Sequence, residues 1–285
     1  MLVRGIVEVA VHTTLLWAAV AFYGLALVLI LPSVRRRRPR LSPWSLGALG
    51  LGLLLHATAL TVTTAQTGRL QPTDVRSALS LFVFTLTAAF FAVYLKYPIT
   101  SLGIFMLPFV FVLSLISALQ PPPSLSPGGL RGGWLLVHIA SMMLGYTGLF
   151  LTSVGAIMYL IQESELKSKK PRAFYYRLPP LEVCDELYYR SLVFGLVFLS
   201  LGILTGVVWA SRTWRGPWQL DPKIVASLAT WIIYLILFST RLSGSGRRRR
   251  AAYLAIFGFA AVMVTFLGIS FLSSQHGFFP KLGSP

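Results

Sequence analysis

The sequence predicts an all-α polytopic membrane protein, a helical bundle of about eight transmembrane helices. Apolar residues make up 55% of its 285 residues, and its mean hydropathy of +0.73 is higher than a soluble surface tolerates. Apolar runs also recur at the length of about 20 residues that a spanning helix needs. These runs lie near residues 8–32, 44–66, 78–95, 101–120, 134–160, 190–210, 224–241 and 251–272. Little chain remains between them, so we expect residues 1–285 to form a single membrane domain.

Prolines mark several ends of the predicted helices, and the first four spans occupy residues 1–133. The first span is expected to end at Leu31-Pro32, the second to begin after Ser42-Pro43, and the fourth to stop at Pro121. The basic cluster follows the first span rather than preceding it, so we interpret this span as a retained helix and not a signal peptide. The segment 121–133 is rich in Pro and Gly and predicts an irregular connection.

Two features of the composition exclude classes of function. The formal net charge is +17, but the basic residues lie mostly in short segments between apolar runs. This distribution is typical of a protein whose partner is a lipid bilayer and argues against nucleic acid. The single cysteine, Cys184, lies in a predicted cytoplasmic loop. One thiol forms no disulfide or CxxC redox pair within the chain, so we expect no thiol chemistry.

Most of the basic residues fall on one side of the predicted bundle. They follow the first and third spans, lie between residues 161 and 190, and precede the eighth span in the cluster 247–250. Short cytoplasmic loops carry an excess of Lys and Arg in membrane proteins. We therefore predict that both termini are extracytoplasmic and that the chain is a multi-pass protein of the cell inner (plasma) membrane.

The longest predicted cytoplasmic loop covers about residues 162–189 and contains many charged and aromatic side chains. One interpretation is a solvated connector with an interfacial amphipathic helix that starts after Pro179-Pro180. The alternative is a docking surface for a partner protein. The composition of the loop fits both.

The four histidines are informative because ionisable residues are costly in hydrocarbon. With the predicted topology, all of them lie in the extracytoplasmic half. His12 is near the start of the first span and His56 is within the second. His138 begins the fifth span, and His276 follows the eighth. The last two flank a third extracytoplasmic element, the segment 209–223.

The segment 209–223 reads WASRTWRGPWQLDPK and combines flat aromatic rings with cations. Its members are Trp209, Trp214, Trp218, Arg212, Arg215 and Lys223. Such a set can cradle a flat anionic ligand, and haem fits that description because its macrocycle stacks on indole rings and its propionates need cations. Its iron takes two axial imidazoles. The alternative is an interfacial tryptophan belt with snorkelling arginines.

The same segment resembles the tryptophan-rich WWD motif of the cytochrome c assembly family, which includes CcsA-, CcmC- and HemX-like proteins. The residues that match are Trp214, Gly216, Trp218, Asp221, Pro222 and Lys223, followed by Trp231 and Tyr234. Upstream, LPPLEVCDELYYR at 178–190 with Gly202 and Gly206 is similar to the family's approach to the motif. The resemblance covers residues 134–278, with His138 and His276 as the two flanking histidines.

The motif is degenerate in this chain. Leu220 stands where the third Trp is expected, Arg215 where a Gly usually follows the first Trp, and Ile224 where a Glu usually follows. Family members of the CcsA type also often carry a histidine at the position of Ser239.

The resemblance implies a haem-binding protein of cytochrome c maturation, with haem b held at the extracytoplasmic face between His138 and His276. The haem would be delivered or attached to apocytochrome c, and a second cytochrome c assembly subunit is an expected partner. Whether the chain is a component of a haem lyase stays open. One alternative is a HemX-like regulatory haem protein of tetrapyrrole metabolism without lyase activity, and another is a membrane protein that binds no haem.

Three further residues have two interpretations each. His56 either ligates iron at a second, intramembrane haem site or hydrogen-bonds between helices. His12 is either a solvated histidine near the interface or a ligand, and Glu8 one turn earlier can accept its ring hydrogen. Asp221 precedes Pro222 and is expected to cap the following helix, and by resemblance it also shapes the loop that binds haem.

Overall fold

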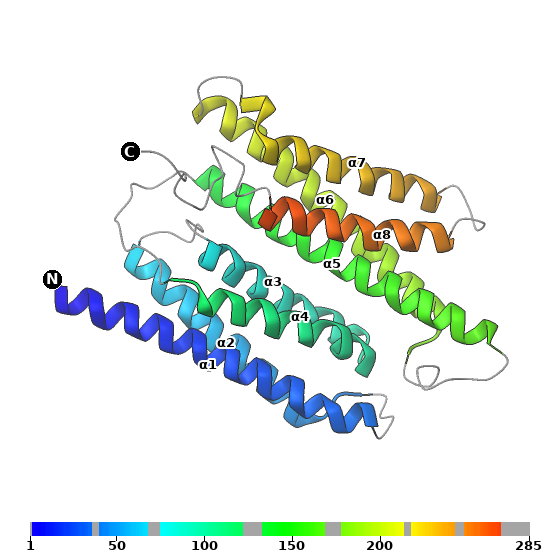
Figure 1. The fold of residues 1–285 in the computed structure, drawn as a ribbon, viewed down its shortest axis with the longest axis horizontal. Helices are drawn as coiled ribbons and strands as arrows, with labels where there is room; N and C mark the ends of the chain where they lie inside the picture. The colour runs from blue at the N-terminus through cyan, green and yellow to red at the C-terminus, as the bar shows by residue number, and fades with distance from the viewer. Residues whose placement is uncertain are drawn as a thin grey trace. The chain divides into compact units, whose positions relative to one another are not determined.

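The described part of the chain contains helices and no strands in a computed structural model of the protein (Figure 1). The structure describes residues 2–35, 40–67, 75–121, 133–168, 178–213, 218–242 and 248–268. Within these residues it contains 8 helices that are long and apolar enough to cross a membrane. The predicted fold class, an all-α bundle of about eight spans, is confirmed.

The spanning helices follow the predicted apolar runs in order. They are α1 (Leu2–Arg35), α2 (Pro43–Thr67), α3 (Val75–Lys96), α4 (Thr100–Leu119), α5 (Gly133–Lys167), α6 (Leu181–Thr213), α7 (Pro222–Leu242) and α8 (Arg248–Met263). A 3-10 turn, η1 (Trp218–Leu220), precedes α7, and a π-helical turn, η3 (Val264–Gly268), follows α8.

Two predicted boundaries are wrong, and both errors concern prolines. Pro32 lies inside α1 instead of ending it. The helix that begins after Pro179-Pro180 is not a separate interfacial element, because α6 runs unbroken from Leu181 to Thr213. No Gly or Pro interrupts the chain between residues 181 and 194, so nothing in the sequence stops this helix before it enters the apolar span. Cys184 consequently lies buried in α6 and not in a loop.

The contacts divide the chain into two compact units. The first unit comprises Met1–Arg131 with Ala173–Pro179, and the second comprises Gly132–Arg172 with Pro180–Pro285. Helices α1 to α4 belong to the first unit and helices α5 to α8 to the second.

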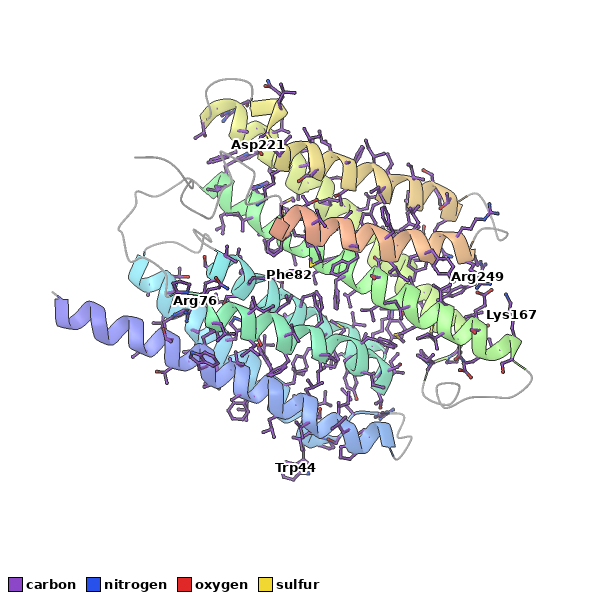
Figure 2. The ribbon with its side chains drawn as sticks, in the orientation of Figure 1. Trp44, Arg76, Phe82, Lys167, Asp221 and Arg249 are labelled. Carbon is purple, nitrogen blue, oxygen red and sulfur yellow. The ribbon has the colours of Figure 1, made fainter. Side chains whose placement is uncertain are left out.

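A buried arginine joins two helix ends in the first unit. Arg76, labelled in Figure 2, lies in the first turn of α3 and is 3% exposed. Its Nη1 donates to the carbonyl oxygen of Gln120 at 2.6 Å, just past the end of α4, and Ser117 Oγ donates to the carbonyl oxygen of Arg76 at 2.9 Å. A cation at a helix C-terminus meets the unsatisfied carbonyls and the negative end of the helix dipole there.

Glycines bring α5 and α6 close together in the second unit. A Cβ placed on Gly148 would lie 2.6 Å from the Cα of Gly195, and one on Gly155 would lie 2.9 Å from the Cα of Tyr188. Small residues at such positions let helix backbones approach closely in a membrane. Side chains on one helix can therefore reach the backbone carbonyls of the other.

Candidate functional site

His138 lies on α5 and faces the backbone of α6. Its Nδ1 is 2.7 Å from the carbonyl oxygen of Gly202. A carbonyl oxygen only accepts hydrogen bonds, so Nδ1 carries the ring proton and donates it. Nε2 is then the unprotonated nitrogen with a lone pair, and it makes no hydrogen bond to any residue that the structure describes. This is the arrangement of metal-ligating histidines, whose second ring nitrogen donates to a carbonyl or carboxylate.

The imidazole of His138 packs directly against Gly206 of α6. A Cβ on Gly206 would lie 2.7 Å from Cε1 and 2.8 Å from Nδ1 of His138, closer than van der Waals contact permits. Any side chain at this position would displace the ring from the Gly202 carbonyl. In the sequence, Gly202 and Gly206 stand out only as part of a family pattern. Their spacing of four residues, about one helical turn, indicates that both lie on the same face of a helix.

Trp134 repeats the pattern of His138 one turn earlier on α5. Its indole Nε1 donates to the carbonyl oxygen of Thr205 at 3.0 Å. The Thr205 hydroxyl also donates to the carbonyl oxygen of Gly202, at 3.0 Å. Two donors one turn apart on α5 thus meet two acceptors about one turn apart on α6. Sequence reasoning missed Trp134 and Thr205.

The tryptophan-rich segment is described in part. Trp209 is half-buried near the end of α6, and Arg212 is exposed one turn later. Trp218 begins the turn η1. Trp214, Arg215, His276 and the side chain of Trp218 lie outside the described residues.

Asp221, labelled in Figure 2, directly precedes α7, and Lys223 is the second residue of that helix. Asp221 is 5% exposed, and its Oδ1 accepts a hydrogen bond from the Lys223 backbone N–H at 2.9 Å. With Pro222 as the first helical residue, Asp221 is the N-cap, and the capping prediction is confirmed. The Lys223 ammonium lies close enough to His138 for its charge to act on the imidazole. Lys223 therefore lies within electrostatic range of His138, although a whole span separates the two residues in the sequence.

His56 has a different environment in the first unit. It is fully buried on α2, with Nε2 2.7 Å from Ser80 Oγ on α3 and Nδ1 3.1 Å from the Tyr23 hydroxyl on α1. Both ring nitrogens are engaged, and the imidazole joins three helices. This geometry favours the helix-to-helix hydrogen-bonding interpretation of His56 over iron ligation.

His12 does not fit the solvated interpretation, because it is only 6% exposed on α1. It lies near enough to His56 for an electrostatic interaction between the two rings. The packing of α1 against its neighbours in the first unit covers this histidine. The side chain of Glu8, the expected partner, lies outside the described part of α1.

These features define a class: a multi-pass helical membrane protein with an imidazole held against a helix backbone in one tautomer. Residues 44–276 match the Cytochrome C assembly protein family. That match covers most of the chain, and the chain belongs to this family. The match begins within α2, so it is longer than the region 134–278 in which the sequence resemblance was found.

Individual relatives agree with the family. The chain is 33% identical over 217 residues to the cytochrome c biogenesis protein CcsA of Guillardia theta, with 68% of this chain and 71% of the relative covered. It is 26% identical over 317 residues to CcsA of Gloeobacter violaceus, with 92% and 90% covered. It is 33% identical over 171 residues to CcsA of Chlamydomonas reinhardtii, with 58% and 46% covered.

Proposed function

We propose that this chain is a haem-binding membrane protein of cytochrome c maturation, which holds haem b at the extracytoplasmic face for delivery or attachment to apocytochrome c. Membership of the cytochrome c assembly family supports the pathway. The observation that carries the haem assignment is the hydrogen bond from His138 Nδ1 to the Gly202 carbonyl at 2.7 Å. This bond holds the imidazole in the tautomer whose Nε2 can coordinate iron.

The residues near His138 fit an anionic macrocycle. The positive charge of Lys223 acts on the His138 imidazole. Trp209 and Arg212 lie near the C-terminal end of α6, the helix against which His138 packs. We propose that Trp209, Trp214 and Trp218 contact the ring and that Arg212, Arg215 and Lys223 bind the propionates. Asp221 fixes the beginning of α7 and with it the position of Lys223.

We assign His276 as the second axial ligand, because it is the other histidine that flanks the tryptophan-rich segment. When bound, haem supplies the vinyl groups to which apocytochrome thiols add. The protein's part is to orient the macrocycle and to ligate its iron, and no side chain of this chain acts as a nucleophile. We assign His56, both of whose ring nitrogens have hydroxyl partners, to packing within the first unit.

The distribution of basic residues supports the proposed extracytoplasmic side of the haem site. Arg248, Arg249 and Arg250 begin α8, whereas His138 lies at the start of α5. In Figure 1 the start of α5, the end of α6 and the start of α7 lie at one end of the second unit, and the start of α8 lies at the other. The positive-inside rule then supports an extracytoplasmic location for the His138 end. We propose the inner membrane as the location.

A spectrum tests the haem assignment. The full chain, purified in mild detergent from haem-supplemented cells, is expected to show a Soret band and the visible bands of bis-imidazole haem. The pair His138→Ala/His276→Ala should lose both. An unchanged bis-imidazole spectrum in that double variant would reject this site, and no Soret band in the wild type would reject haem binding.

A second candidate function is a HemX-like regulator of tetrapyrrole metabolism. It is favoured by Ser239, which occupies the place of a family histidine and whose Oγ donates to the Leu235 carbonyl of its own helix at 2.9 Å. Deletion of the gene separates the two functions. Loss of c-type cytochromes supports the maturation role, whereas intact c-type cytochromes with altered tetrapyrrole levels support the regulator. Co-purification of apocytochrome c or a second assembly subunit would identify the partner.

A further inference from the structure

Three exposed arginines begin α8. Arg248, Arg249 and Arg250 form its first turn, and all three are exposed. The guanidinium of Arg249 lies 5.8 Å from the centre of the Tyr253 ring, and its Nη2 donates to the Tyr253 hydroxyl at 3.4 Å. The first turn of α8 therefore presents cations above an aromatic residue on the surface of the second unit.

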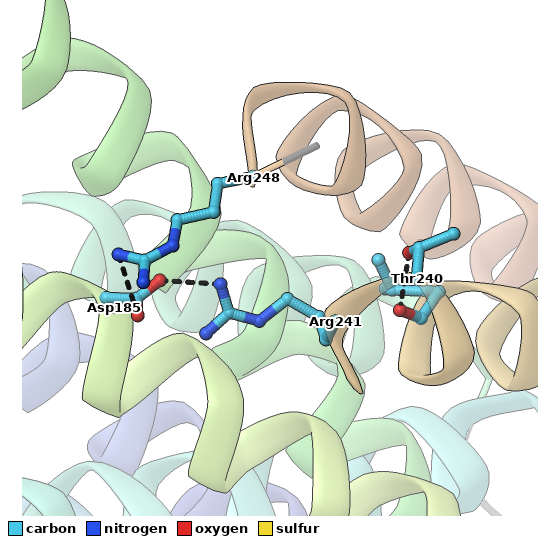
Figure 3. Close-up of polar contacts among 5 residues, drawn as sticks. Asp185, Thr240, Arg241 and Arg248 are labelled. Atoms are coloured by element: carbon cyan, nitrogen blue, oxygen red, sulfur yellow. Dashed lines mark hydrogen bonds and ion pairs between the residues drawn. The ribbon is translucent and has the colours of Figure 1, made fainter. Parts of the chain in front are cut away.

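Asp185, the carboxylate that pairs with this turn, is shared with a second guanidinium group. In Figure 3 the guanidinium groups of Arg241 and Arg248 converge on Asp185 of α6. Arg241 Nη1 lies 2.8 Å from Asp185 Oδ1, and Arg248 Nη1 lies 3.9 Å from Oδ2. One carboxylate thus serves two guanidinium groups, and the shorter contact belongs to Arg241.

Arg241 adds an unsatisfied donor to this cluster. Only 10% of its side chain is exposed, yet its buried Nε has no hydrogen-bond acceptor within the described residues. The cluster is therefore short of acceptors as well as of negative charge.

Two other described cations of the second unit have their own acids. Lys167, which lies at the same end as Arg249 in Figure 2, is 2.6 Å from Glu163. Arg190 is 2.6 Å from Glu186. Among the described residues, Lys167 and Arg190 are thus paired with acids, whereas Arg249 and Arg250 of α8 make no salt bridge.

An apolar face continues directly from these arginines. Tyr253 and Phe257 are 52% and 64% exposed. Residues 249, 253 and 257 are spaced by four, so they lie on one face of the helix. At a rise of 1.5 Å per residue, this face extends about 12 Å from Arg249 into the apolar part of the span. A free phosphate would use the arginines and leave this face without a role.

We propose that an anionic phospholipid binds here, with its phosphate on the first turn of α8 and an acyl chain along Tyr253 and Phe257. The guanidinium groups match phosphate oxygens in geometry and charge. The exposed apolar face favours a lipid over free phosphate as the source of the phosphate group, because a lipid joins a phosphate to a hydrocarbon chain. This inference does not depend on haem binding, which the preceding proposal assigns to the opposite end of the second unit.

Native mass spectrometry of the full chain in mild detergent tests the proposal. Phosphatidylglycerol and phosphatidylcholine with identical acyl chains are titrated, and tighter binding of phosphatidylglycerol is expected. The variant Arg249→Gln/Arg250→Gln keeps Arg248 on Asp185. At about 1 kcal/mol per arginine near the membrane surface, it should bind phosphatidylglycerol roughly 30-fold more weakly. The control Lys167→Gln/Arg190→Gln removes two paired cations at the same end and should bind as the wild type does.

Three results would overturn the proposal. Equal affinity for the two lipids would remove the charge argument, and unchanged binding by Arg249→Gln/Arg250→Gln would remove the site. Displacement of the lipid by millimolar inorganic phosphate, with unaltered binding by Phe257→Ala, would identify a free-phosphate site instead. If the double variant is not monodisperse, Arg249→Gln and Arg250→Gln are tested singly, with about five-fold weaker binding expected for each.

Discussion

The two units each contain a buried or half-buried histidine on a spanning helix, and the two rings differ in how their nitrogens are used. His56 in the first unit has hydroxyl partners on both nitrogens, from Ser80 and Tyr23. His138 in the second unit bonds one carbonyl and keeps Nε2 unbonded within the described residues. His56 and His138 therefore differ in whether a ring nitrogen remains for a ligand, although both lie on spanning helices.

This difference between the two histidines predicts different effects of their removal on protein stability and on ligand binding. Removing the His56 ring leaves the buried Ser80 hydroxyl without its partner, and an unsatisfied buried group costs about 1–3 kcal/mol. The Tyr23 hydroxyl loses one hydrogen bond and keeps the one to Thr87. Removing the His138 ring leaves the Gly202 carbonyl with the Thr205 hydroxyl at 3.0 Å. We expect His56 to determine folding of the first unit and His138 to determine haem ligation, and four substitutions test this division.

The largest expected effect is on haem. His138→Ala should reduce haem content more than about tenfold, because one axial ligand is lost and the Coulombic pairing with propionates alone does not fix the iron. Its melting temperature should change little. Haem per protein by pyridine haemochrome, together with thermal unfolding in detergent, measures both. Retained haem with a lowered melting temperature would assign His138 to packing, like His56.

The next effect is on stability. His56→Ala should lower the free energy of unfolding by about 3 kcal/mol, from the lost packing and the lost hydrogen bonds to Ser80 and Tyr23. The haem content of the protein that remains folded should equal that of the wild type. Loss of one haem per chain without loss of stability would instead support the second haem site that the sequence left open at His56.

Gly206→Ala tests the packing of α6 against the His138 ring while His138 itself is kept. The added Cβ would meet Cε1 at 2.7 Å, and overpacking of this kind costs about 1–3 kcal/mol. Haem affinity should fall several-fold and the bis-imidazole bands should shift or weaken. The control is Gly47→Ala on α2, where nothing lies within 4 Å of the new Cβ, and which should leave the spectrum unchanged.

The smallest effect is expected at the cap of α7. Asp221→Ala removes the acceptor of the Lys223 N–H and should destabilise the second unit by about 1 kcal/mol. Asp221→Asn preserves the cap and should restore most of that stability. A loss of haem in both variants, without a change in melting temperature, would show that the Asp221 charge acts on the ligand site directly.

Much of the fold could be predicted because it depends on local sequence. Runs of about 20 apolar residues specify spans in any membrane protein, and Asp221-Pro222 specifies a helix start with a side-chain cap. Where local signals conflict, prediction failed. Pro32 is a helix breaker in water, yet α1 continues through it, and the charged segment before residue 190 joins its apolar span as one helix.

The candidate site was predicted by residue type but not by arrangement. His138 followed from its place beside the tryptophan-rich segment, whereas its acceptor is a backbone carbonyl 64 residues away. Every residue has such a carbonyl, so no side-chain pattern distinguishes Gly202 as the partner. The same holds for Trp134, whose acceptor is the backbone of Thr205, 71 residues away.

By itself, the sequence determined a helical membrane protein of eight spans, its family and the capped start of α7, because hydropathy, motifs and caps act over a few residues of contiguous chain. Only the tertiary structure decided which imidazole has a nitrogen left for a ligand. That outcome depends on partners from other helices, which are Tyr23 and Ser80 for His56 and the glycine-lined backbone of α6 for His138. Close helix packing, which glycine permits and larger residues prevent, is the physical reason for the difference.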